Sequence, residues 1–291
     1  MMLKEHLQNA DPAIARVILS LAKGALQVKR FFYTTIHQTG TKNQYGEEQL
    51  ELDTAADRYW VELLEKVDDV KTIVTEEREG ILETGRTRGL GIALDPMDGV
   101  SSMETNLSLG PIFGIFKNGI MTGPETKIIA AMYILYGPLT TLVYSVGKGT
   151  HEFVLQEDGS WKLRRENIKI PEGKIYVPSG TRDKYVPDHE TLMQRLEKEG
   201  YKIRCVGAMI ADVNNILVHG GFYCYPKLKD NPEGKIRLLF ECLPMAFLVE
   251  QAGGYASDGQ QRMLDIKPVK PNQKSPIYIG SHDLVKAIQV R

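Results

Sequence analysis

Two pairs of carboxylates stand out in the sequence because each follows a short apolar run. Glu76 and Glu77 follow VKTIVT, and Asp95 and Asp98 stand in the string LDPMDG that follows LGIA. Carboxylate oxygens are the ligands that hard divalent cations such as Mg²⁺ prefer, usually together with a substrate phosphate and water. The pattern favours a metal site at the ends of two strands, although Asp-Pro-x-Asp-Gly is also good turn chemistry.

Phosphate-binding groups directly follow the second acid pair. Gly99, Val100 and Ser101 offer backbone N–H groups and a hydroxyl that together could cradle a phosphate beside the cations. Asp53 begins a predicted helix and Asp57 lies one turn later, and for these two acids an N-cap and a solvated side chain are the simpler interpretations.

Pro244 decides how the next group of polar residues is arranged, because proline is tolerated only in the first turn of a helix. A helix therefore begins near Glu241, and residues 236–240 are predicted as a strand. The period of two then places Lys235, Arg237, Leu239 and Glu241 on one face. This face is either a phosphate clamp or a surface ion-pair ladder.

The other candidate ligands show no metal-binding spacing. Three cysteines, at 205, 224 and 242, include no CxxC pair and are expected to be reduced thiols. The six histidines are scattered and are expected to be structural: His6, His37, His151, His189, His219 and His282.

The elements that must position these residues form an α/β pattern. Helices are predicted over 14–26, 53–69, 190–199, 208–219 and 283–290, with a polar loop at 38–51. Strands are predicted over 70–74, 90–95, 112–116, 128–136, 140–146, 151–156, 174–177, 202–206, 222–225 and 276–280. The run of strands in the first half indicates a largely antiparallel or mixed sheet rather than a simple Rossmann fold. We expect an N-terminal half over 1–170 and a C-terminal half over 171–291.

Composition and charge narrow the function classes. The 291 residues are 42% hydrophobic and carry 36 Lys and Arg against 37 Asp and Glu. Such a chain can bury a core, and it has no net positive field for nucleic acid or an anionic membrane. No apolar run reaches the roughly 20 residues of a membrane span, and no signal peptide is evident, so a cytoplasmic protein is expected.

Four strings together resemble one enzyme family. They are TEE at 75–77, ALDPMDG at 93–99, LSLGPIFGIF at 107–116 and GKIRLLFECLPMAFLVEQAGG at 234–254. Their order and spacing closely resemble class I fructose-1,6-bisphosphatases, within the Mg²⁺-dependent, lithium-sensitive sugar and inositol phosphatases. The resemblance implies a layered α/β fold with mixed sheets between helices, and hydrolysis of the 1-phosphate of fructose 1,6-bisphosphate in gluconeogenesis. ETN at 104–106, GTHEF at 149–153 and AGGYASDG at 252–259 look more like sedoheptulose-1,7-bisphosphatases.

The resemblance also implies roles for individual residues. The metal-ligand positions match Glu76, Glu77, Asp95, Asp98, Glu241 and the backbone carbonyl of Met97, with two or three Mg²⁺ per site and Mn²⁺ as an alternative. The catalytic positions match Asp53, Glu77 and Glu47, where Glu47 replaces an Asp of a mobile loop. The substrate-binding positions match Asp98, Gly99, Val100, Ser101, Ser179, Arg204, Tyr225, Lys235 and Arg237. Arg204 matches an arginine that, in the family, reaches the distal phosphate from a neighbouring subunit. This match implies a homo-oligomer, which is expected to be a tetramer.

Departures from the family pattern fall on substrate contacts. Val100 stands at a usual serine, Cys205 at a tyrosine and Ser179 at an asparagine. The stretches that look like sedoheptulose-1,7-bisphosphatases make sedoheptulose 1,7-bisphosphate the alternative substrate, alone or as a second one. An inactive sugar-phosphate sensor is the alternative of a different class, although none of the five metal-binding carboxylates has been lost.

AMP is not expected to regulate this protein. Animal-type members of the family bind AMP with a Lys-Tyr pair and an arginine, and Gly89, Leu90 and Thr126 stand at those positions here. Each charge-assisted hydrogen bond contributes about 1.5 to 3 kcal/mol, so losing two weakens AMP binding by roughly a hundredfold or more. An AMP titration at saturating Mg²⁺ and low fructose 1,6-bisphosphate checks this, and half-inhibition at micromolar AMP would contradict it.

Overall fold

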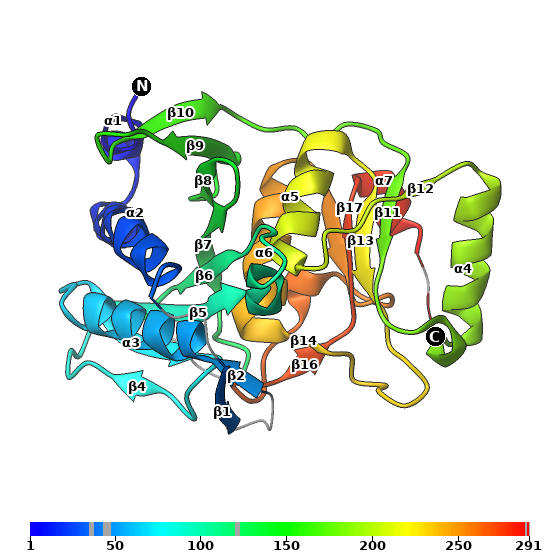
Figure 1. The fold of residues 1–291 in the computed structure, drawn as a ribbon, viewed down its shortest axis with the longest axis horizontal. Coiled ribbons are helices and arrows are strands. Elements are labelled where there is room, and N and C mark those ends of the chain that lie inside the picture. The colour runs from blue at the N-terminus through cyan, green and yellow to red at the C-terminus, as the bar shows by residue number, and fades with distance from the viewer. Residues whose placement is uncertain (35–37, 43–47, 120–122, 289, 291) are drawn as a thin grey trace.

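The chain folds into five layers in the order helices, sheet, helices, sheet, helices (Figure 1). The computed structural model describes residues 1–34, 38–42, 48–119, 123–288 and 290, and for residues 38–42 and 48–50 it describes the backbone alone. The expected α/β class, with mixed sheets between helices, is confirmed.

The first sheet has eight strands in the order β10-β9-β8-β7-β6-β5-β3-β4. Its strands are β3 Val70–Thr75, β4 Leu82–Glu83, β5 Leu90–Asp98, β6 Gly110–Phe116, β7 Ile128–Tyr136, β8 Thr140–Ser145, β9 His151–Leu155 and β10 Trp161–Arg165. Every described pair is antiparallel except β3 with β5, which run parallel. The mixed sheet expected from the sequence is therefore present, and β10 is a strand that the sequence pattern missed.

Three helices cover the outer face of this sheet: α1 Leu3–His6, α2 Pro12–Phe31 and α3 Glu51–Glu65. Asp11 caps α2 by accepting hydrogen bonds from the N–H groups of Ala13 and Ile14, and Pro12 occupies the first turn. The apolar stripe of α2 is buried as predicted, except that Leu26 is 38% exposed.

The second sheet has five strands in the order β12-β11-β13-β17-β15. They are β11 Ile175–Pro178, β12 Lys202–Ile203, β13 Phe222–Tyr225, β15 Tyr255–Ser257 and β17 Ile277–Gly280. Alternate residues of its strands point to opposite faces, as a period of two requires. Phe222 and Cys224 pack in the outer cluster with α4 Pro187–Lys198 and α7 His282–Lys286, whereas Tyr223 packs in the cluster between the two sheets.

The middle layer consists of α5 Met209–His219 and α6 Leu243–Gln251. Every residue from 243 to 249 is buried, because α6 is apolar all round and lies between the two sheets. The predicted strand over 236–240 is wrong. Only Ile236–Arg237 is extended, as β14 paired with β16 Lys274–Ser275, and Leu238–Cys242 form a π-helical turn that leads into α6.

Three smaller expectations are also corrected. The polar segment 38–51, read as a loop, contains the antiparallel pair β1 Gln38–Lys42 and β2 Glu48–Leu50. The helix of Asp53 begins at Glu51, so Asp53 lies within its first turn and is not its N-cap. The strand predicted over 202–206 ends at Ile203.

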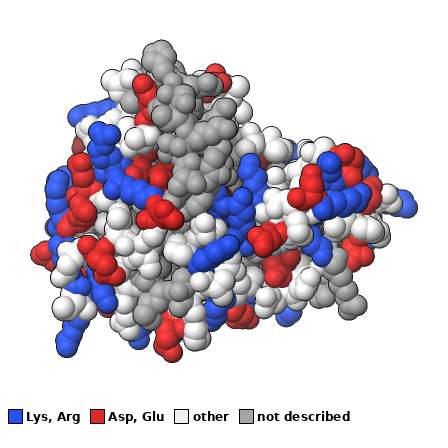
Figure 2. All heavy atoms as spheres, turned by 90° about the horizontal axis from the view of Figure 1, so that it is seen from below, with Lys and Arg blue, Asp and Glu red and all other residues white. Residues whose placement is uncertain are grey.

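The surface and the thiols agree with the composition. On the face shown in Figure 2, lysine and arginine side chains are interspersed with aspartate and glutamate. Among the described residues, no helix is both long enough and apolar enough to cross a bilayer. All three cysteines are free, and Cys205 is exposed while Cys224 and Cys242 are buried.

Gly24 sets the close approach of α2 to α3, and we expect Gly24→Ala to destabilise the protein. A Cβ atom at Gly24 would lie 2.5 Å from Cζ3 of the fully buried Trp60. Overpacking costs about 1 to 3 kcal/mol, which outweighs the gain of roughly 1 kcal/mol in helix propensity. Thermal unfolding measures the difference, with the exposed Lys23→Ala as the control. A Gly24→Ala variant as stable as the parent would show that the two helices separate freely.

Candidate active site

The acid pairs meet because the strands that carry them are parallel neighbours. Thr75 at the end of β3 pairs with Leu94 of β5, and the N–H of Glu76 donates to the carbonyl of Leu94 at 3.1 Å. The carboxyl ends of β3 and β5 therefore lie at the same edge of the sheet. Glu76 and Glu77 come directly beside Asp95, as the sequence predicted.

A β-bulge turns Asp95 and Asp98 toward one site. Residues three apart in a regular strand point to opposite faces. In β5, Asp95 pairs with Ile112 and Asp98 with Gly110, so one extra residue is inserted between the two aspartates. Pro96 lies within the bulge, where its missing N–H costs no ladder hydrogen bond. The Asp95 carboxylate accepts the N–H of Met97 at 2.8 Å, which fixes the bulge.

The π-helical turn delivers the fifth acid from the other half of the chain. Glu241 lies in this turn, and its Oε2 accepts the backbone N–H of Arg237 at 2.8 Å. The Arg237 guanidinium reaches Glu76, with Nε 3.4 Å from Oε1. Arg237 and Glu241 thus come together through a helical turn rather than through the predicted strand alternation.

The carboxylates form a tight cluster. One oxygen each of Asp95, Asp98 and Glu241 lies within 4.8 Å of the other two. Burial, followed by the charge of Glu76 and of the other acids, raises the pKa of Asp95 and of Glu241 well above their ordinary values. Burial also raises the pKa of Asp98 to about 6, against the opposing hydrogen bond that Asp98 accepts from the N–H of Ile210 at 2.6 Å.

Asp57 holds the segment that carries the glutamates, contrary to the expectation that it is solvated. It is 5% exposed and accepts hydrogen bonds from the hydroxyl of Thr75 at 2.5 Å and from Nε of Arg78 at 2.6 Å. Thr75 and Arg78 flank Glu76 and Glu77 in the chain, and the Thr75 hydroxyl also accepts the N–H of Glu77 at 3.0 Å. These bonds fix the backbone on both sides of the two glutamates.

A cavity of about 430 Å³ brings most of the predicted residues together. The predicted residues that line it are Asp53, Glu76, Glu77, Asp95, Met97, Asp98, Gly99, Val100, Ser101, Ser179, Tyr225, Lys235 and Glu241. Gly99 is needed where the chain turns, because it has a φ of 79° and a Cβ there would lie 2.3 Å from Cβ of Ala208.

Two of the predicted residues that the structure describes do not line this cavity. Arg237 is 2% exposed and is paired with Glu76. Arg204 is exposed beside β12, where its N–H donates to the carbonyl of Tyr176 at 3.2 Å. Glu47 lies outside the described residues.

Sequence reasoning missed Asp212, which lines the cavity from α5. It is 1% exposed, and its carboxylate accepts the N–H groups of Val206 at 2.7 Å and Gly207 at 3.1 Å. Asp212 therefore fixes the loop that carries Arg204 and Cys205. Its one signal in the sequence is an acid among the apolar residues that begin the helix, in the string MIADV.

The donor set fits divalent cations. Three buried or partly buried carboxylates crowd together with raised pKa values, and the nearby Arg237 supplies one positive charge. All the donors are oxygens, which hard cations such as Mg²⁺, Mn²⁺ and Ca²⁺ prefer. Glu76, Asp95, Asp98 and Glu241 would hold such ions, with the backbone N–H groups after Asp98 beside them.

The layered fold and the acid-lined cavity suit an enzyme that uses divalent cations, and comparisons with known proteins specify a family of phosphatases. Models of the fructose-1-6-bisphosphatase N-terminal and C-terminal domains match residues 14–166 and 170–290. The chain is 42% identical to the class 1 fructose-1,6-bisphosphatase of Pelobacter propionicus, covering 99% of this chain and 91% of that protein. It is 37% identical to the class 1 enzyme of Methanocorpusculum labreanum, with coverages of 99% and 90%. This chain belongs to the fructose-1,6-bisphosphatase family.

Solved structures agree with this assignment. The holo form of Leishmania major fructose-1,6-bisphosphatase superposes with a TM-score of 0.92 at 27% identity, covering 98% of this chain and 97% of that one. The T-state of the same enzyme gives a TM-score of 0.86, with coverages of 98% and 96%.

Without bound cations, the acid cluster should destabilise the protein once its carboxyl groups lose their protons. Asp98→Asn removes one of these charges and should reduce the destabilisation. A carboxyl group whose pKa is raised in the folded state contributes stability at low pH, and this is lost as pH rises from its unfolded value of 3.8 through about 6. In EDTA the melting temperature of the parent should therefore fall more between about pH 5 and pH 8 than that of Asp98→Asn.

Divalent cations should stabilise the parent more than they stabilise Asp98→Asn. At about pH 8, Mg²⁺ should raise the melting temperature of the parent and have a much smaller effect on Asp98→Asn. Asp283→Asn, at a fully exposed acid, is the matched control. Equal Mg²⁺ stabilisation of the parent and Asp98→Asn would rule out Asp98 as a ligand.

Proposed function

We propose that this chain is a Mg²⁺-dependent fructose-1,6-bisphosphatase that removes the 1-phosphate of its substrate. The observation that carries the proposal is the convergence of Asp95, Asp98 and Glu241 within 4.8 Å, beside Glu76, in a cavity that also exposes phosphate-binding groups. Membership of the fructose-1,6-bisphosphatase family supports the substrate class, a sugar bisphosphate.

The chain's residues would act on the reacting phosphate from three sides. Bound Mg²⁺ would supply the charge that polarises the phosphate and lowers the pKa of the attacking water. The backbone N–H groups of Gly99 to Ser101 would orient the phosphate, and Val100 keeps its N–H although it lacks the usual hydroxyl. Glu77 and Asp53 line the cavity and would accept the proton of the attacking water. Glu47 would take part as well, as the family pattern implies.

The remainder of the substrate would be held by the other wall of the cavity. Lys235, Tyr225 and Ser179 line this wall and would contact the sugar and its distal phosphate. Arg237, which pairs with Glu76, would also hold the sugar bisphosphate, and Arg204 would contact the distal phosphate of a neighbouring subunit's substrate. In this proposal residues 1–170 hold most of the cation ligands and residues 171–291 hold the sugar phosphate, with Glu241 crossing between the halves.

The cellular setting is part of the same proposal. A homotetramer would bring Arg204 to the neighbouring site. Hydrolysis of fructose 1,6-bisphosphate would serve gluconeogenesis in the cytoplasm.

Phosphate release in the presence of Mg²⁺ tests the activity. The substrates compared are fructose 1,6-bisphosphate, sedoheptulose 1,7-bisphosphate, inositol monophosphate and adenosine 3′,5′-bisphosphate. The fructose substrate should be hydrolysed fastest. The sedoheptulose arm matters because Cys205 and Ser179 line the cavity in place of a larger tyrosine and asparagine. Binding of either bisphosphate without phosphate release would indicate a sensor instead of an enzyme.

Asp98→Asn should reduce kcat by about two or more orders of magnitude, equivalent to a barrier increase of about 3 kcal/mol. The reason is that the acid lies in the cluster that would hold Mg²⁺ and accepts the N–H of Ile210. Asp283→Asn should retain the parent's rate. Near-normal turnover by Asp98→Asn would refute the assignment of the metal site.

Arg204→Ala should raise KM more than it lowers kcat, because the distal phosphate is remote from the bond that breaks. Steady-state kinetics with fructose 1,6-bisphosphate measure both constants. Lys202→Ala, at a nearby exposed cation, is the control. If KM stays the same in Arg204→Ala, Arg204 does not contact the substrate.

A further inference from the structure

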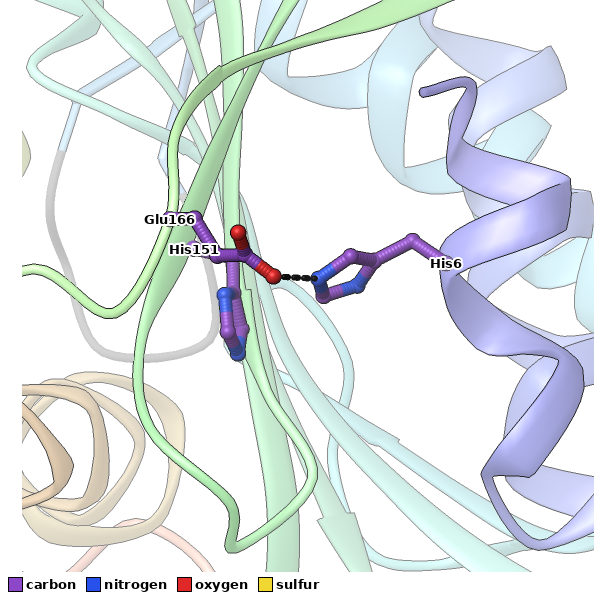
Figure 3. A group of neighbouring side chains, drawn as sticks. All are labelled: His6, His151 and Glu166. Atoms are coloured by element: carbon purple, nitrogen blue, oxygen red, sulfur yellow. Dashed lines mark ion pairs between the residues drawn. The ribbon is translucent and has the colours of Figure 1, made fainter.

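A second cluster of ligand side chains lies toward the other edge of the eight-stranded sheet. His6 comes from α1, His151 from β9 and Glu166 from the segment after β10, and the three side chains point toward one another (Figure 3). One nitrogen of each imidazole and one carboxylate oxygen lie within 4.8 Å of one another. The histidines expected to be isolated are therefore neighbours, with ring centroids 4.4 Å apart.

This histidine cluster is separate from the acid cluster. In the sheet order, β9 lies four strands from β5, which carries Asp95 and Asp98. At about 4.8 Å per strand, the two sites are roughly 19 Å apart across the sheet.

His151 is held by two backbone groups, and a cation would replace the N–H of Asn167 at its Nδ1. Its Nε2 lies 3.1 Å from the carbonyl of Lys148, which can only accept, so Nε2 carries the proton. Nδ1 then accepts the N–H of Asn167 at 3.2 Å, at the long end of the hydrogen-bond range. A ring nitrogen bonded to a backbone carbonyl is the usual orientation of a metal-binding histidine.

His6 has the complementary arrangement. Its Nδ1 is hydrogen-bonded to the hydroxyl of Tyr144, and its Nε2 faces Oε1 of Glu166 at 3.6 Å. When Nδ1–H donates to Tyr144, Nε2 presents a lone pair toward Glu166. The side chain of His6 is 12% exposed and that of Glu166 is 52% exposed, so solvent reaches the cluster from the Glu166 side.

The backbone around His6 is anchored, which reduces the entropy cost of binding an ion there. The N–H of Leu163 in β10 donates to the carbonyl of Met1 at 3.0 Å, and Met2 forms a β-bridge with Lys162. Leu3 and Leu7 are buried on either side of His6 in the chain. Two of the three candidate ligands are therefore already positioned by the fold.

We propose that His6, His151 and Glu166 form a binding site for Zn²⁺ or a similar transition-metal ion that clamps α1 to the edge of the sheet. Two imidazoles and a carboxylate are a common zinc donor set, and water can complete the tetrahedron. Mg²⁺ prefers oxygen ligands, so it should not fill the histidine cluster, whereas Zn²⁺ can also bind carboxylates. The bound ion would stabilise the N-terminal helix against the sheet and would not enter the phosphatase reaction.

A titration of the full-length chain with Zn²⁺ tests the proposal. The protein is stripped with a chelator, dialysed and then saturated with Mg²⁺ to occupy the acid cluster, and Zn²⁺ binding is measured by calorimetry. Because Zn²⁺ also competes with Mg²⁺ for carboxylates, we expect one Zn²⁺ per chain that Asp98→Asn leaves in place, apart from any that the acid cluster takes up. Co²⁺ in place of Zn²⁺ should give the strong visible absorption of a tetrahedral nitrogen-containing site, whereas Co²⁺ in a six-coordinate oxygen site absorbs weakly.

Four variants assign the site. His6→Ala and Glu166→Gln should each weaken Zn²⁺ binding by about a hundredfold or more, and Tyr144→Phe, which removes only the partner of His6, by roughly ten- to a hundredfold. His282→Ala is the matched control, because His282 is exposed and pairs with Asp283. It should bind Zn²⁺ like the parent. Because Glu166 is exposed, Glu166→Gln decides the result if His6→Ala fails to fold.

Three outcomes would overturn the proposal. The first is no Zn²⁺ binding in the presence of Mg²⁺, which would leave only an ion pair between His6 and Glu166. The second is Zn²⁺ binding that Glu166→Gln and His6→Ala leave intact but Asp98→Asn abolishes, which would place the ion in the acid cluster. The third is an equal loss of binding in His282→Ala.

Discussion

Asp95, Asp98 and Glu241 each place a carboxylate oxygen within 4.8 Å of the other two, with Asp95 and Glu241 buried and Asp98 partly buried. Burial is the main cause of their raised pKa values, and the charges of neighbouring acids add to it. A flexible chain would relax such a cluster by turning the side chains outward. Here the acids stay together because each is fixed by backbone hydrogen bonds that form as part of the fold, so the surrounding structure bears the cost of assembling the site before any cation binds.

Two local departures from regular secondary structure, a β-bulge and a π-helical turn, hold the three acids in place. The bulge in β5 aligns Asp95 with Asp98, and the π-helical turn before α6 aims Glu241 at both. The π-helical turn packs against β5 and continues into α6, whose residues 243–249 are all buried between the two sheets. Because the same apolar cluster includes strands of both sheets, the distance between Glu241 and the β5 aspartates is set by core packing.

The parts of this arrangement that follow local rules were predictable from the sequence. Apolar strands ending in acids, a helix with proline in its first turn and a mixed sheet all follow from periodicity and turn chemistry. The π-helical turn could not be predicted in this way, because residues 236–240 also fit a strand. Only packing between the two sheets decides between a strand and a helical turn there. Burial of Asp57 and Asp212 was missed because their partners, such as Thr75 and the N–H of Val206, become neighbours only on folding. The meeting of His6 with His151 was hidden for the same reason.

Arg237 partly compensates the negative charge of the acid cluster. Its backbone N–H donates to Glu241 while its guanidinium pairs with Glu76, so one residue compensates two acids. A cation held by Glu76 would compete with that ion pair, and a substrate phosphate would compete with Glu76 for the guanidinium. A bound cation would free the guanidinium for the phosphate, and a bound phosphate would free Glu76 for the cation. By thermodynamic linkage, each ligand would therefore strengthen binding of the other. The arginine that the sequence suggested as a phosphate clamp is, in this structure, an internal counter-ion whose release would link cation binding to substrate binding.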